Sequence, residues 1–360
     1  MKTTLCTLYN SLYLDKGLVL YDSLNECAKD FELYVLCMDD KCYEVLKKEN
    51  REHIVPINLE DFENEELLRL KKERKLGEYY WTCSSWLISY VLDTYKNDHC
   101  TYIDADMYFY HDPACLIEEL EQRKATVMVV GHRFYPLLAE QKAWKVGKYC
   151  VEFNTFKNEE QAVGLLKKWN LQVLEHCSLD GDGMHWGDQK YLDSWDNEEY
   201  VVETKNMGAG VAPWNISQYR LVSKSSDTFY LSHYGQECQL VFYHFENIHY
   251  PEEHVANINL EVYWGIDKSL IDCLYVPYLK KIAAKKGYLN KRYGIDFTIK
   301  KHPGVEEPTA KVNILKGIAN YYGLLVDMAK RNRDILFPIK YLIKCRLPKF
   351  LYSKYNIVKY

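Results

Sequence analysis

The chain has 360 residues, of which 48% are hydrophobic and 27% are charged. This balance suits a folded protein with one large core or two modest ones, and it excludes a chain that is disordered throughout. No run approaches the ~18 apolar residues that a membrane-spanning helix needs. The formal charge of -5 is unevenly distributed, because residues 280–360 hold 19 Lys and Arg against 5 Asp and Glu. A basic tail on an acidic body predicts that the tail meets an anionic surface.

The first hundred residues alternate strand and helix patterns. Strands are predicted over residues 4–9, 31–37 and 53–59, and helices over 17–28, 42–48, 65–75 and 81–96. Continuous apolar strands separated by helices predict parallel pairing with both faces of the sheet covered. Ligands of such sheets bind beyond the carboxyl ends of the strands. We therefore expect Tyr9-Asn10, Asp39-Asp40 and Asp104-Ala105-Asp106 to project into one crevice.

Two carboxylates, Asp104 and Asp106, follow a short buried strand at residues 101–103. Such a pair offers hard oxygen ligands to Mg²⁺ or Mn²⁺. Mg²⁺ rarely takes an all-protein cage, so it keeps open positions for phosphate oxygens. The pair therefore indicates a site for a nucleotide diphosphate. The alternative is structural, because Asp residues also cap turns and helices at strand ends.

The second half of the chain has a different texture. Strands are predicted over 125–131, 151–156, 200–204 and 219–224, and helices begin near 114 and over 161–176 and 187–195. Residues 229–233 and 239–245 are predicted to form an antiparallel pair. The loops between these elements are long and Gly-rich, and long loops often bind substrate. From about residue 266 the pattern is helical and basic, which predicts a domain at 1–265 and an extension at 266–360.

The cysteines indicate the compartment. The twelve cysteines have irregular spacings, form no Cys-x-x-Cys pair, and fall partly in apolar runs, as Cys37 and Cys100 do. This usage is typical of buried thiols in a reducing compartment. Polar residues interrupt the apolar stretch at the N-terminus, so no signal peptide is expected. We predict a cytoplasmic protein.

Over residues 1–250 the chain resembles the nucleotide-diphospho-sugar transferases of the GT-A fold, in the style of the glycogenin-like and lipopolysaccharide glycosyltransferases. The matching segments are Thr7-Leu8-Tyr9-Asn10, Tyr102-Ile103-Asp104-Ala105-Asp106, Phe153-Asn154-Thr155-Phe156-Lys157-Asn158, Gly187-Asp188-Gln189 and Tyr243-His244-Phe245. The resemblance implies an α/β/α sandwich with a mixed central sheet. The helical C-terminal extension lies outside it.

The resemblance also implies roles for single residues. Asp104, Asp106 and His244 would hold the metal, and Asp104-Ala105 and the segment Thr7 to Tyr9 would bind the nucleotide sugar. The chain departs from the pattern after His244, where Phe245-Glu246 replaces the Gly and Lys-Pro-Trp of the glycogenin-like enzymes, so the usual phosphate-contacting Lys is missing there. Taken alone, His244 on the aromatic run 242–245 favours a buried core histidine, and its order after the acidic triplet favours the metal ligand instead.

The resemblance further implies that Asn154, Asp188 and Gln189 would face the donor sugar and the acceptor, with Asp188 and Gln189 as the catalytic residues. Each has a structural alternative, because Asp188 could be a helix N-cap and Asn154 could satisfy a strand bulge.

Four further residues are candidates for donor binding. Arg74 and Lys75 could neutralise a pyrophosphate, yet they also belong to a mixed charge run on a helix face. Trp214 and Asn215 offer a stacking face and an amide to a sugar, yet a Pro-Trp turn is also ordinary packing.

These features predict a metal-dependent glycosyltransferase that uses Mn²⁺ or Mg²⁺. It would move a hexose from a nucleotide sugar, a UDP-sugar, to a surface-glycan or lipid-linked saccharide acceptor. The basic amphipathic residues 335–354 would place it on the anionic inner face of the membrane. The alternative is that this segment is a helical cap that packs on the domain and leaves a solvated basic face. No nucleic-acid partner is expected. The alternative is a catalytically inactive, transferase-like protein that binds membranes or acts as a scaffold.

Two other enzyme classes fit less well. A sugar-1-phosphate nucleotidyltransferase needs a Gly-rich phosphate loop after the first strand, and residues 7–16 contain no glycine. A phosphatase with an Asp-x-Asp nucleophile needs that pair on its first strand rather than at residue 104.

Overall fold

A computed structural model describes residues 2–297, apart from 182, 226–227, 253 and 263–265, together with residues 356–360. The helices are α1 (Leu14–Cys27), α2 (Asp40–Glu49), α3 (Leu59–Phe62), α4 (Glu65–Glu73), α5 (Leu76–Tyr95), α6 (Ala114–Gln122), α7 (Ala139–Val146), α8 (Glu160–Glu175) and α9 (Lys268–Tyr293). The strands are β1 (Thr3–Tyr9), β2 (Phe31–Cys37), β3 (Ile54–Asn58), β4 (His99–Ile103), β5 (Met107–Phe109), β6 (Val127–Gly131), β7 (Tyr149–Lys157), β8 (Val201–Glu203), β9 (Tyr219–Lys224), β10 (Phe229–His233), β11 (Gln236–Gln239), β12 (Phe242–His244), β13 (His249–Glu252), β14 (Val255–Asn257) and β15 (Ile357–Lys359).

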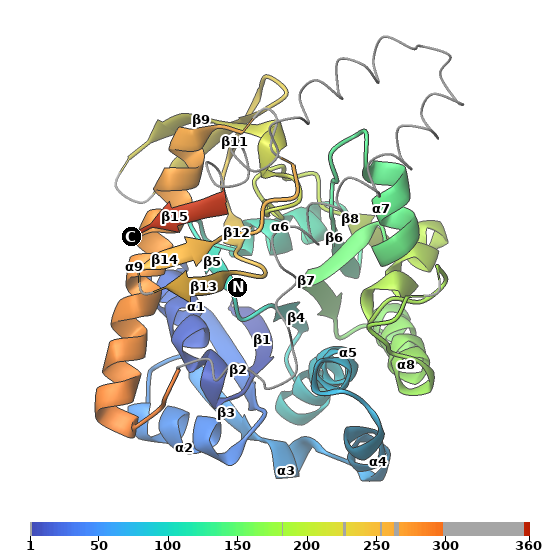
Figure 1. Cartoon of the computed structure of the whole chain (residues 1–360). Helices are drawn as coiled ribbons and strands as arrows, with labels where there is room; N and C mark the ends of the chain where they lie inside the picture. Colours follow the sequence, from blue (N-terminus) through green and yellow to red (C-terminus); the bar gives the residue numbers. More distant parts are fainter. Residues whose placement is uncertain (1, 182, 226–227, 253, 263–265, 298–355) are drawn as a thin grey trace.

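Within these residues the largest sheet has seven strands in the order β3-β2-β1-β4-β7-β6-β8 (Figure 1). Parallel pairs join β3, β2, β1 and β4 in sequence and also join β6 to β8. Strand β7 runs antiparallel to both of its neighbours, β4 and β6. The sheet is therefore mixed, and the predicted α/β architecture with a mixed central sheet is confirmed.

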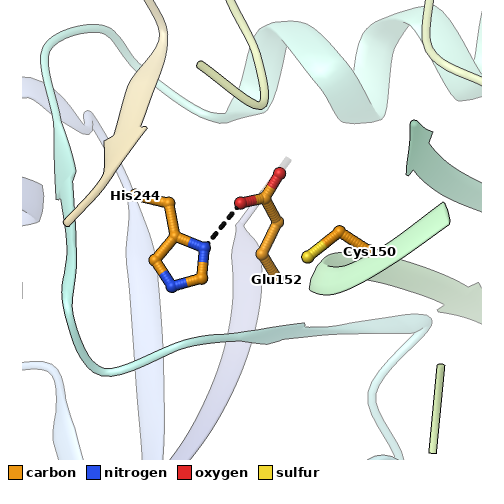
Figure 2. Close-up of side chains that lie close together, drawn as sticks. All are labelled: Cys150, Glu152 and His244. Carbon is orange, nitrogen blue, oxygen red and sulfur yellow. Dashed lines mark hydrogen bonds and ion pairs between the residues drawn. The ribbon is translucent and has the colours of Figure 1, made fainter. Parts of the chain in front are cut away.

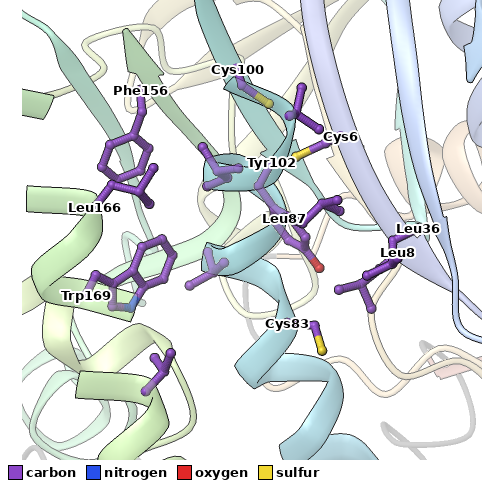
Figure 3. Packing of buried hydrophobic residues seen from close by; sticks show 14 of the residues in the cluster. Cys6, Leu8, Leu36, Cys83, Leu87, Cys100, Tyr102, Phe156, Leu166 and Trp169 are labelled. Carbon is purple, nitrogen blue, oxygen red and sulfur yellow. The ribbon is translucent and has the colours of Figure 1, made fainter. Parts of the chain in front are cut away.

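Helices cover both faces of this sheet. Buried residues of α5 and α8 form one cluster with the sheet, in which Leu87 and Trp169 are fully buried beside Tyr102 and Phe156 (Figure 3). Residues of α1, α2 and α6 form a second cluster on the opposite face. Both faces of each central strand are thus apolar, which explains why these strands read as continuous hydrophobic runs.

The predicted antiparallel partner of 229–233 was half wrong, because of the predicted range 239–245 only Gln239 belongs to the partner strand β11, and residues 242–244 form a separate strand, β12. Strand β11 pairs with β10 around the turn at Tyr234 and Gly235, whose φ angles of 48° and 89° fit a tight hairpin. Strand β12 leaves that hairpin and pairs antiparallel with β5 instead. The aromatic ring of Phe242 gains a buried position against Phe109 there, with ring centroids 5.5 Å apart.

The first part of the basic extension packs on the acidic helix α1. Lys281 of α9 pairs with Glu26 at 2.8 Å, and Lys285 pairs with Asp22 at 2.6 Å. The extension is not helical at its end, because β15 adds a strand to β14 (Figure 1). Residues 335–354, predicted to meet a membrane, lie outside the described residues. Among the described helices, none is both long and apolar enough to cross a membrane.

Candidate active site

The pairing of β12 with β5 brings His244 to the acidic pair. His244 lies opposite Met107 in the register, and the backbone N–H of Phe245 donates to the carbonyl of Asp106 at 2.9 Å. The backbone N–H of Met107 donates to the carbonyl of Asp104 at 3.4 Å, which closes a turn that contains both carboxylates. Backbone hydrogen bonds thus fix residues that are more than 130 positions apart in the chain.

The three side chains converge. Nε2 of His244 lies 3.1 Å from Oδ1 of Asp106 and 3.7 Å from Oδ2 of Asp104. His244 and Asp106 are buried, whereas the side chain of Asp104 keeps 31% of its surface exposed. These three residues therefore lie close together, as expected from the sequence. The group is exposed to solvent at Asp104.

A fourth residue, Glu152 of β7, holds the other side of the imidazole. Its Oε2 lies 2.7 Å from Nδ1 of His244, and its side chain is fully buried (Figure 2). A neutral ring whose Nδ1 proton is donated to this carboxylate would have its Nε2 lone pair available to a cation placed between Nε2 and the carboxylates of Asp104 and Asp106. The sulfur of Cys150 is also near, so that Cys150, Glu152 and His244 form a second group whose ligand atoms lie within 4.8 Å of one another.

Burial and the neighbouring charges shift the pKa values of these groups. Burial raises the pKa of Asp104 to about 7, although the charge of His244 opposes the shift. Burial alone would raise the pKa of Asp106 too, but hydrogen bonding to His244 and the charge of Lys16 lower it overall. For His244, burial favours the neutral ring, yet the hydrogen bonds with Asp106, Cys150 and Glu152 raise its pKa well above the usual value. The site therefore concentrates negative charge around one imidazole.

Asp188 turns its carboxylate into the protein. It precedes the 3-10 helix Gln189–Asn197 without capping it, and accepts a hydrogen bond from the hydroxyl of Ser84 in α5. Burial raises the pKa of Asp188 to about 7, the bond from Ser84 opposes this, and the charge of Asp104 adds to it. Gln189 donates to the carbonyl of Val146 at 2.7 Å. The negative charge of Asp104 thus raises the pKa of Asp188. The side-chain amide of Gln189, by contrast, is hydrogen-bonded to the backbone.

The expected nucleotide-binding residues of β1 are core residues. Thr7 is fully buried, and Tyr9 is 1% exposed with its ring against α1. The polar groups at the end of this strand are the next two residues instead. Asn10 donates to the hydroxyl of Tyr80 at 3.1 Å, and the hydroxyl of Ser11 donates to Asp39 at 2.8 Å.

Arg74 and Lys75 lie away from the acidic pair. The guanidinium of Arg74 donates to the carbonyls of Val173 and Leu174, at the end of α8, at 2.7 Å each. Nζ of Lys75 lies 3.2 Å from Asp180 on the surface. Both side chains therefore have structural partners outside the acidic group.

Trp214 and Asn215 are buried residues that pack and hydrogen-bond inside the protein. The indole of Trp214 is 6% exposed and meets the imidazole of His244 edge-on, with ring centroids 5.5 Å apart. Asn215 is fully buried and donates to the carbonyls of His132 and Gly210. Asn154 is also fully buried, and neither atom of its amide has a hydrogen-bond partner among the described residues. None of the three presents an open face for a sugar.

Three residues that sequence reasoning did not select are central to this geometry: Glu152, Lys16 and Ser84. A signal existed for Glu152, because a carboxylate stands between Val151 and Phe153 in an otherwise apolar strand, and buried Glu is rare unless paired. Lys16 and Ser84 carry no comparable signal, because Lys and Ser are ordinary on helices and their partners are distant in sequence.

No family model matches this chain. It is 30% identical over 278 residues to YfnD of Bacillus subtilis strain 168, described as an uncharacterized protein, with 76% of this chain and 86% of YfnD covered. The chain belongs to the YfnD family. A second B. subtilis protein, YfnF, is 30% identical to this YfnD-family chain over 254 residues, which cover 68% of this chain and 81% of YfnF.

Solved structures similar to this YfnD-family chain have lower identities. The galactosyltransferase LgtC in complex with donor and acceptor sugar analogues is 12% identical, with a TM-score of 0.47 over 79% of this chain and 96% of LgtC. Mouse xyloside xylosyltransferase 1 in its apo form is 14% identical, with a TM-score of 0.43 over 68% of this chain and 98% of that chain.

Proposed function

We propose that the protein is a metal-dependent glycosyltransferase that moves a hexose from a nucleotide sugar, a UDP-sugar, to a saccharide acceptor. The observation that carries this proposal is the convergence of Asp104, Asp106 and Nε2 of His244 within 3.7 Å at the carboxyl end of β4. Ligands of open α/β sheets bind at this end of the strands.

The donor set suits a divalent cation. Asp104 and Asp106 offer carboxylate oxygens, which Mg²⁺ and Mn²⁺ prefer, and the imidazole of His244 favours Mn²⁺ over Mg²⁺. Glu152 orients that imidazole, as carboxylates commonly do for metal-binding histidines. When bound, such an ion would neutralise negative charge on a diphosphate.

The reaction exchanges one carbon–oxygen bond for another. The bond between the anomeric carbon and the diphosphate breaks, and its electron pair stays on the diphosphate oxygen. The acceptor hydroxyl forms the new bond, and its proton passes to the departing diphosphate or to water. We assign the sugar side of the site to Asp188, because its carboxylate is buried and interacts with the charge of Asp104. Gln189 follows it at the start of the 3-10 helix and remains a candidate for the same side.

The proposed acceptor is a surface-glycan or lipid-linked saccharide, as predicted from the sequence. The anionic-surface contact assigned to residues 335–354 is part of this proposal. Three lysines of α9, Lys281, Lys285 and Lys286, pair with acidic residues of α1, namely Glu26, Asp22 and Asp15.

The experiment is release of nucleoside diphosphate from a panel of nucleotide sugars, with Mn²⁺ and with EDTA. The proposal predicts release by the wild type with Mn²⁺, none with EDTA, and loss of at least a hundredfold in Asp106→Asn. Asp112→Asn is a matched control, because Asp112 accepts from the backbone N–H of Ala114 at 3.0 Å and lies outside the site.

A wild type that releases nothing from any nucleotide sugar, yet binds anionic vesicles, would favour the alternative of an inactive membrane-binding protein. Release that persists in Asp106→Asn would contradict the assigned site.

A further inference from the structure

Lys16 is a buried lysine whose ammonium group reaches the carboxylate that faces His244. Its Nζ lies 3.7 Å from Oδ2 of Asp106, while Nε2 of His244 lies 3.1 Å from Oδ1 of the same carboxylate. Lys16 is only 9% exposed. An imidazole and an ammonium group therefore flank one carboxylate, each at a different oxygen.

The surroundings of Lys16 hold its ammonium at this position. Lys16 lies in the first turn of α1, and its Nζ is 3.6 Å from the centre of the Tyr13 ring. The neighbouring carboxylate of Asp15 has another partner, because Nζ of Lys286 in α9 lies 3.7 Å from it. Across the described part of the chain, Asp106 is the one carboxylate within 4.0 Å of the Lys16 ammonium. The positive charge is thus directed at the site and not at its own helix.

The contact with Asp106 leaves the N–H donors of this ammonium available to another acceptor. At 3.7 Å it is longer than a hydrogen bond, and an ammonium has three N–H donors. Lysine also binds phosphate as a point charge. The site needs this charge, because a divalent ion carries fewer charges than the carboxylates of Asp104, Asp106 and Glu152 together. The charge of Lys16 offsets the remaining negative charge and so favours the binding of a diphosphate.

We propose that Lys16 binds the diphosphate of the nucleotide sugar and of the nucleoside diphosphate product. This inference rests on the proposed function and adds a substrate-binding residue to it. As the bond to the anomeric carbon breaks, its electron pair increases the negative charge on the leaving diphosphate. The ammonium of Lys16 stabilises that charge by electrostatic attraction, without transferring a proton.

The test compares two affinities that respond differently to the loss of this charge. Calorimetry measures the affinity for Mn²⁺ alone, and then the affinity for the tightest binder among UDP, GDP, CDP and ADP at saturating Mn²⁺. Lys16→Met should weaken nucleotide binding by about ten- to a hundred-fold, the loss expected for a charged hydrogen bond. It should leave Mn²⁺ binding unchanged or tighter, because a positive charge beside Asp106 has been removed.

Two variants complete the design. Lys16→Arg keeps the charge and should retain more nucleotide affinity than Lys16→Met. Lys286→Met removes the other lysine of this cluster and should change neither affinity. If Lys16→Met does not fold, as judged by thermal unfolding, Lys16→Gln takes its place.

The outcomes separate the two proposals. A parallel loss of Mn²⁺ and nucleotide affinity in Lys16→Met would assign Lys16 a structural role and overturn the inference. An unchanged nucleotide affinity would also overturn the inference, because Lys16 would then not bind the diphosphate. A wild type that binds none of the four nucleotides with Mn²⁺ would instead refute the proposed function itself.

Discussion

Glu152 and His244 form a buried carboxylate–imidazole pair, with 2.7 Å between Oε2 and Nδ1. The pair joins β7 to β12, which belong to different sheets. It fixes the direction in which Nε2 points and therefore the position of any ion between His244 and the acidic turn. The geometry of the proposed metal site would thus depend on Glu152, which bonds the nitrogen of the imidazole that does not face the acidic turn.

Glu152→Gln should weaken Mn²⁺ binding by about ten- to a hundred-fold, the range found for residues that orient metal-binding histidines. The amide keeps the shape of the side chain but loses the charge that favours the proton on Nδ1. Titration calorimetry measures the effect, and Glu203→Gln on β8 is a matched control that should bind Mn²⁺ as the wild type does. Equal affinity in Glu152→Gln and the control would contradict the orienting role.

The absorption spectrum of bound Co²⁺ can show whether an ion binds at Nε2 of His244, beside Asp104 and Asp106, or at Nδ1, beside Glu152 and Cys150. The group of Cys150, Glu152 and His244 is the competing site, and an ion there would have a thiolate ligand. Burial raises the pKa of the Cys150 thiol well above its usual value, which disfavours the thiolate in the ion-free protein. We expect Co²⁺ bound to the protein to show no thiolate-to-cobalt charge-transfer band, and Cys150→Ser to keep the wild-type affinity for Mn²⁺. A strong band that Cys150→Ser removes would place the ion on the Nδ1 side.

Gly17 lets the ring of Tyr9 lie against α1. A Cβ atom on Gly17 would lie 2.3 Å from Cζ of Tyr9, which is a clash. Alanine is favoured over glycine inside a helix by about 1 kcal/mol, but overpacking costs about 1–3 kcal/mol. Gly17→Ala should therefore lower the free energy of unfolding by up to about 2 kcal/mol in urea denaturation.

The matched control for that change is Gly164→Ala in α8, where nothing lies within 4 Å of the added Cβ. This variant should gain about 0.5–1 kcal/mol, because only helix propensity changes. The double variant Gly17→Ala with Tyr9→Leu should recover part of the loss. A stabilising Gly17→Ala would show that Tyr9 moves aside at no cost.

His132 makes the fold sensitive to acid. Its ring stacks on Phe134, and burial lowers the pKa of His132 from 6.5 to about 3. Between those values the unfolded chain binds a proton that the folded chain does not, so stability falls as the pH falls from about 6.5. Full uptake of one proton gives a slope of about 1.4 kcal/mol per pH unit.

The corresponding variant is His132→Phe, which keeps an aromatic ring and removes the titrating group. Its free energy of unfolding, measured in urea at pH 7 and pH 5, should fall by about 1–2 kcal/mol less than that of the wild type. Equal losses would assign the acid sensitivity to other groups.

The sequence was sufficient for the local features of this molecule. The strand 31–37 was predicted with its observed bounds, because this largely apolar run is short for a helix and contains Phe31, Tyr34 and Val35, which favour a strand. Asp104 and Asp106 stand out because they follow a buried strand directly. The predicted antiparallel pair over 229–233 and 239–245 was half wrong, because apolar periodicity identifies a strand but not its partner.

The parts that failed or were missed depend on contacts between distant segments. Thr7 and Tyr9 look available for a nucleotide in sequence, but helices cover both faces of β1 and bury them. Lys16 meets Asp106 only because α1 begins beside the turn after β4, and no local pattern records that approach. The contact between Trp214 and His244 likewise depends on the tertiary fold and leaves no local sequence pattern.

The most direct test of the account is the binding of UDP to the wild type and to Asp106→Asn, each measured by calorimetry with Mn²⁺ and again with EDTA. If Asp104, Asp106 and His244 hold an ion that binds the diphosphate, UDP binds the wild type only with Mn²⁺, and Asp106→Asn binds it at least a hundredfold more weakly. UDP affinity that is the same with Mn²⁺ and EDTA, or unchanged in Asp106→Asn, would contradict the account.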